Sequence, residues 1–130
     1  MSIRFFTDEK EIPISLEASW LGNDLNISIS GGDKGHIGAV AVAQARPSLS
    51  DPMITSASTS VITICGHKED RLACEIAEKA ATKINGVVSV ACGIHIGDAN
   101  DEQIAEIISS VKRLLEQLIQ HIRSSRSDSD

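Results

Sequence analysis

Two short segments of this 130-residue chain combine glycine, histidine and charged side chains at the point where an apolar run gives way to a helix-like one. A strand that runs through glycine into a helix exposes backbone N–H groups and the positive end of the helix dipole, which suits phosphate or another anion. We therefore expect a binding site at these two junctions. Its candidate residues are Gly66, His67 and Lys68 in the first segment and Gly93, His95 and Asp98 in the second.

A third glycine-rich segment, residues 31–38, contains Gly35 and His36 and is expected to form a loop whose N–H groups and Lys34 could hold phosphate. A hairpin or β-bulge is the alternative structure. If the three segments converge, His36, His67 and His95 could bind a divalent metal, with Asp98 or Asp70 as an oxygen ligand. Histidines that only cap helices or bond backbone are an equally open alternative. Whether a metal binds is therefore left undecided.

Composition narrows the classes of function. The net charge is -6 and no basic cluster is present, which disfavours nucleic acid and anionic membranes as partners. No apolar run approaches the roughly 18 residues of a membrane span. Three cysteines without a Cys-x-x-Cys pair, in a chain without a secretory-signal pattern at its start, indicate a cytoplasmic protein. No catalytic set is recognisable, so a binding role is expected rather than an enzyme.

The elements that must position these segments follow from periodicity. Alternating apolar residues predict a hairpin over residues 12–30, and further strands over 39–45, 60–65 and 87–91, with a surface loop over 55–60. A helix should follow the strand 60–65 and end at Asn85-Gly86. A long helix over 101–122 should begin with a capping box formed by Asn100 and Gln103. The polar tail, residues 123–130, is expected to be disordered.

The order of elements predicts one α+β domain over residues 1–122, a two-layer sandwich with a mainly antiparallel sheet and both helices of the C-terminal half on one face. The strands that flank the first helix are expected to be parallel neighbours. A second, uncovered sheet face that includes the isoleucine-rich hairpin would need a partner, so we expect a homodimer or larger assembly.

The glycine-histidine segments and the helix that begins at Asp101-Glu102-Gln103-Ile104 resemble those of the LpdD-like proteins, and the resemblance spans about residues 12–120. That family is regarded as prenylated-flavin chaperones associated with UbiD-type decarboxylases. The resemblance implies non-catalytic binding of prenylated FMN and its delivery to such a decarboxylase, with the matched positions His36, Gly66, His67, Lys68, Gly93 and His95 in the site. Two alternatives stay open: a metal-dependent enzyme that uses the histidines, and a structural accessory subunit of a decarboxylase.

Overall fold

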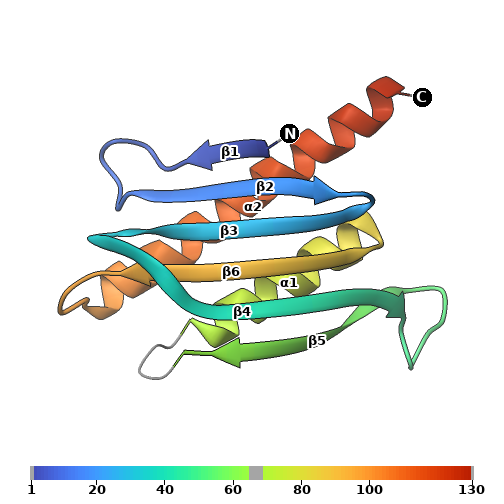
Figure 1. Ribbon diagram of the computed structural model, residues 1–130, viewed down its shortest axis with the longest axis horizontal. Helices are drawn as coiled ribbons and strands as arrows, with labels where there is room; N and C mark the ends of the chain where they lie inside the picture. The colour runs from blue at the N-terminus through green and yellow to red at the C-terminus, as the bar shows by residue number, and fades with distance from the viewer. Residues whose placement is uncertain (1, 65–68, 130) are drawn as a thin grey trace.

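The computed structural model describes residues 2–64 and 69–129 of the chain. It is an α+β fold in which a six-stranded sheet is covered on one face by two helices (Figure 1). This confirms the predicted two-layer architecture. In chain order the elements are β1 Ser2–Phe6, β2 Ile14–Leu21, β3 Asp24–Gly32, β4 Lys34–Pro47, β5 Thr55–Thr63, α1 Asp70–Ile84, β6 Val87–His95 and α2 Asp101–Ser129.

The strands lie in the order β1-β2-β3-β6-β4-β5. All neighbouring strands are antiparallel except β3 and β6, which pair in parallel from Leu25 opposite Val88 to Gly32 opposite His95. The expectation that the strands flanking the first helix are neighbours was wrong, because β4 lies between β5 and β6. Because β6 lies between β3 and β4, the end of β3, the start of β4 and the end of β6 lie together at one end of the strands.

The core lies between the helices and one sheet face. Alternate residues of the four inner strands are fully buried, among them Leu16, Ile27, Ala41 and Val90. The small alanines of β4 allow α1 to approach closely, and α1 buries an alanine-rich face that includes Ala77. Burial of this aliphatic surface away from water supplies the main drive for folding.

Both helices begin or end where the sequence predicts. Asn100 and Gln103 form the expected capping box, in which the Gln103 N–H donates to Asn100 Oδ1 at 2.8 Å and the Asn100 N–H donates to Gln103 Oε1 at 2.9 Å. At the end of α1, Asn85 adopts the left-handed conformation with φ of 54°. Neither helix of the described residues has a stretch that is both long and apolar enough to cross a membrane.

Three local predictions were wrong. Residues 55–60 belong to β5 and do not form a loop, because serine and threonine also suit an exposed edge strand. Residues 31–38 form the end of β3, a turn and the start of β4, with a bulge between Gly35 and Ala39, as the alternative interpretation held. The helix expected to end at residue 122 continues to Ser129. Helix propagation adds one hydrogen bond per residue and can proceed without an apolar face.

Over the hairpin of β2 and β3, the second face of the sheet is not the apolar surface expected from the sequence. Ile27 and Ile29 of the hairpin are buried beneath the helices. Their neighbours Asn26 and Ser28 therefore point to the uncovered face, since side chains alternate along a strand. The hairpin therefore offers no apolar surface to a partner; the exposed apolar residues Val42 and Ile62 of this face lie on β4 and β5.

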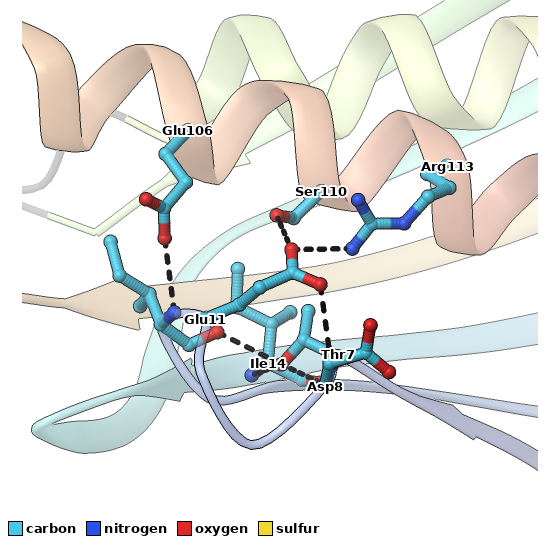
Figure 2. A network of polar contacts seen from close by, with 8 residues as sticks. Thr7, Asp8, Glu11, Ile14, Glu106, Ser110 and Arg113 are labelled. Carbon is cyan, nitrogen blue, oxygen red and sulfur yellow. Dashed lines mark hydrogen bonds and ion pairs between the residues drawn. The ribbon is translucent and has the colours of Figure 1, made fainter.

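The loop between β1 and β2 is tied to α2 by polar contacts (Figure 2). The Glu11 carboxylate accepts hydrogen bonds from Arg113 at 2.6 Å and from Ser110 at 3.3 Å. Glu106 accepts the backbone N–H of Ile12 at 3.0 Å. These contacts hold the N-terminal half of α2 against the loop between β1 and β2.

Candidate functional site

The start of β4 and the end of β6 form the junction at which four of the predicted site residues meet. In the ladder between these strands Lys34 lies opposite His95 and Gly35 lies opposite Ile94. The bulge that follows Gly35 turns His36 out of the regular alternation. The glycine-rich sequence thus positions a histidine rather than forming an open loop.

His36 lies between an acid and a second histidine. Its Nε2 is 3.1 Å from Glu69 Oε1, and its ring is 6.3 Å from that of His95, centroid to centroid, in an edge-to-face arrangement. The side chains of His36 and Glu69 are only 18% and 15% exposed, whereas His95 is exposed. The other carboxylate oxygen, Glu69 Oε2, is buried and has no hydrogen-bond partner among the described residues. A buried acceptor of this kind can take a donor from a bound molecule.

Gly93 allows the backbones of β4 and β6 to approach closely at the junction. A Cβ atom at this position would collide with the carbonyl oxygen of His36. At Gly38 a Cβ atom would meet the Glu69 carboxylate. Both glycines therefore leave the room that the His36–Glu69 pair occupies, and a larger residue at either position would displace the pair.

Asp98 lies beyond the end of β6 in the connection to α2, where it is exposed and has a positive φ of 52°. The neighbouring Gly97 N–H donates to Asp33 Oδ2 at 3.0 Å, which joins this connection to the turn between β3 and β4. The structure thus brings Gly35, His36, Gly93 and His95 together and leaves Asp98 at the margin. Gly66, His67 and Lys68 lie outside the described residues.

Metal binding by the predicted histidine trio gains no support from the residues that the structure describes. Within residues 2–64 and 69–129 no group of three histidine, cysteine, aspartate or glutamate side chains has the geometry to hold a metal ion. His36 and His95 are close to one another, but His67 is not among the described residues.

A groove of about 800 Å³ opens beside the junction, between the start of α1, the start of α2 and the end of β6. Its apolar wall consists of Leu72, Ile94, Ile104, Ile107 and Ile108. Ile104 and Ile108 are 46% and 37% exposed, because the first turns of α2 extend past the part of the sheet that covers the rest of the helix. The groove shares Glu69 with the junction.

Charged side chains line the rim of the groove. Lys112 pairs with Glu75 at 3.6 Å, and Glu69 contacts His36. Arg71 also lines the groove and forms no ion pair with any residue in the described part of the chain. Its guanidinium is therefore available to an anionic ligand, and guanidinium groups bind phosphate through two parallel hydrogen bonds.

The Cys92 thiol, next to Gly93 at the junction, is unsuited to nucleophilic chemistry. Burial and, to a smaller extent, the nearby Glu69 carboxylate together raise the pKa of Cys92 to about 12. At neutral pH this side chain is a protonated, apolar group of the core.

Sequence reasoning missed Glu69, Arg71 and the groove. Glu69 stands at the start of α1, where an acidic residue is expected for the helix dipole alone, yet its side chain makes no capping hydrogen bond and contacts His36 instead. In the sequence, Ile104, Ile107 and Ile108 recur at helical spacing and belong to one apolar stripe of the long helix. A stripe that is continuous in sequence gives no signal of where the sheet beneath it ends.

Comparison with known proteins gives one family and a fold relative. Residues 8–123 match a family described as the prenylated flavin chaperone LpdD-like domain. No curated protein matches the chain. Among solved structures, a chain in the crystal structure of a novel chaperone complex for yeast 20S proteasome assembly is similar, with a TM-score of 0.56 and 10% sequence identity over 95% of each chain. At this identity the likeness concerns the fold alone.

Proposed function

The chain belongs to the prenylated flavin chaperone LpdD-like family, and on that premise we propose that it binds prenylated FMN and delivers it to a UbiD-type decarboxylase without catalysing a reaction. The observation that carries the proposal is the family match, which includes the junction of β4 with β6 and the groove beside it. Delivery requires a site that binds the cofactor tightly and also releases it to the partner.

We place the ligand over the junction and the groove. The groove volume falls within the range of roughly 300–1,000 Å³ that is usual for small-molecule sites. Its wall of isoleucine and leucine suits the apolar part of a prenylated ring system. No aromatic side chain lines the groove among the described residues, so the ring would lie against aliphatic side chains. Trp20, the single tryptophan, lines a separate pocket with His121 and Arg126.

The polar groups at the site suit the rest of the molecule. Arg71 on the groove rim and the exposed Lys34 opposite His95 are cations that could hold the phosphate. The unsatisfied Glu69 Oε2 could accept a hydrogen bond from a ring N–H or a hydroxyl group. These residues bind and orient a ligand but supply no obvious nucleophile, since the Cys92 thiol stays protonated.

The test is an oxygen-free titration of the purified chain with prenylated FMN and with FMN, in oxidised and reduced forms, followed by absorbance and calorimetry. We expect micromolar or tighter binding of prenylated FMN, on the order of -8 kcal/mol, and weaker binding of FMN. In the Ile104→Glu variant a carboxylate replaces part of the apolar wall, so affinity should fall at least about tenfold, or about 1.4 kcal/mol.

Leu21→Glu is the matched control, because Leu21 is an exposed apolar residue at the end of β2 and does not line the groove. This variant should bind prenylated FMN as tightly as the unmodified chain. Equal affinity in Ile104→Glu would remove the groove from the site. Absence of binding in every redox state would overturn the carrier role and leave the structural accessory subunit as the better account.

A further inference from the structure

Exposed apolar side chains gather at one edge of the sheet. Ile54, Val61, Ile62 and Ile64 on β5 and its ends are all at least 40% exposed, and Val42 on the neighbouring β4 is 44% exposed. Ile62 reaches 72%. Ile54 lies before the start of β5, and the others lie at its end with Val42 beside them on β4. Exposed apolar side chains clustered along a strand offer a surface that another protein can cover.

The backbone of β5 is also available for pairing. The Ile64 N–H donates to Gly38 O, and Ile54 O accepts the Ser48 N–H, so the even-numbered residues of β5 bond to β4. The odd-numbered residues Ala57, Thr59 and Val61 therefore turn their N–H and C=O groups away from the sheet. These groups can bond to one more strand.

The opposite edge of the sheet, formed by β1, has features that prevent the addition of another strand, and β5 lacks them. β1 is only five residues long, carries Arg4 in an ion pair with Glu17, and is followed by the charged loop residues Asp8 and Glu9. β5 is nine residues long and contains neither a charged residue nor a proline. Edge strands are normally protected by charge, proline or shortness, and β5 lacks all three.

We propose that β5 pairs antiparallel with β5 of a second copy of this chain and forms a two-fold dimer with a continuous sheet. An antiparallel pair of identical strands closes on itself, so neither copy leaves this edge unpaired. Charge favours a second copy at this place: each chain carries a net charge of -6, yet residues 52–64 contain no charged side chain. Two acidic chains can therefore meet along this strip with little direct repulsion.

The proposal is tested by sedimentation velocity of the full chain at concentrations from about 1 to 200 µM. We expect a dimer of the 13.8 kDa chain at the higher concentrations. Val61→Pro removes an outward N–H and leaves the bonds to β4 intact, and it should weaken dimerisation at least tenfold. Ile62→Lys, at a position that is 72% exposed, should have the same effect by adding a like charge to each strand.

Phe6→Pro is the matched control. The Thr7 N–H bonds to Ile14 O, so the Phe6 N–H also points away from the sheet, but on the β1 edge. This variant should dimerise normally. A chain that stays monomeric throughout the concentration range, or a dimer that Val61→Pro and Ile62→Lys leave intact while both variants remain folded by circular dichroism, would overturn the proposal.

Discussion

At the scale of single residues, the contact between His36 and Glu69 is the feature that best links sequence to site. Both side chains are largely buried, and the glycines at 38 and 93 leave room for them. A polar pair with low exposure is costly to break, because each group left alone keeps its desolvation cost without its partner. The pair therefore belongs to the framework of the junction as well as to the proposed ligand surface.

We predict that His36→Ala lowers the free energy of unfolding by about 1–3 kcal/mol, because the Glu69 carboxylate loses the ring N–H that it contacts at 3.1 Å. The double variant His36→Ala, Glu69→Ala should lose less than the sum of the two single changes. Urea unfolding of the four proteins gives the coupling energy. Additive losses would mean that the contact contributes nothing to the stability of the junction.

Residue types alone identified part of this junction. Glycine beside histidine at the expected strand ends singled out Gly35, His36, Gly93 and His95, and the structure brings these four together. Glu69 and Arg71 carried no such signal, because charged residues are common in the first turn of any surface helix. Their proximity to His36 and the groove arises from the path of α1 beneath the sheet, which no local pattern encodes.

At the scale of elements, the loop between β1 and β2 is fastened to α2 mainly by Glu11 (Figure 2). The hydrogen bond from Arg113 holds the pKa of the Glu11 carboxyl below its ordinary value of about 4.5. A carboxyl group with a lowered pKa stabilises the folded state above its ordinary pKa, and that contribution disappears as the pH falls through the lowered value.

We therefore predict that Glu11→Gln lowers the melting temperature at pH 7 and that the difference from the unmodified chain shrinks as the pH falls from about 5 toward 3. Thermal unfolding by circular dichroism at each pH measures the difference. Glu9→Gln is the control, since Glu9 lies in the same loop and forms no ion pair within the described residues. A difference that stays constant with pH would show that Glu11 acts through packing rather than charge.

Helix ends and the first hairpin could be predicted because their signals are local. Asn100 with Gln103 and Asn85 specify helix ends through contacts within a few residues. The pairing of β3 with β6 could not be predicted, because it joins segments about 60 residues apart. The apolar pattern of each strand shows that it is buried but does not specify which strand lies beside it. Residues 55–60 were missed because serine and threonine suit both loops and exposed strands.

At the scale of the whole molecule, the fold gathers its exposed features at different places. The junction and groove lie where β4 and α1 begin and β6 ends. The unprotected β5 forms an edge of the sheet (Figure 1). β5 leads through residues 64–69 into α1, whose first turn lines the groove. In an antiparallel dimer along β5, the end of β5 that leads into α1 would lie beside the start of the partner's β5, so the two binding regions would lie at opposite ends of the paired strands.

The most direct test of the carrier account is transfer of the cofactor. The chain is loaded with prenylated FMN without oxygen and mixed with an apo-form of a UbiD-type decarboxylase, and decarboxylation is followed over time against the same amount of free cofactor. The account predicts faster activation by the loaded chain, with the flavin absorbance leaving it in parallel, and no activation by a loaded but unrelated flavin-binding protein beyond that of free cofactor. Activation no faster than with free cofactor, despite stable loading, would contradict the account.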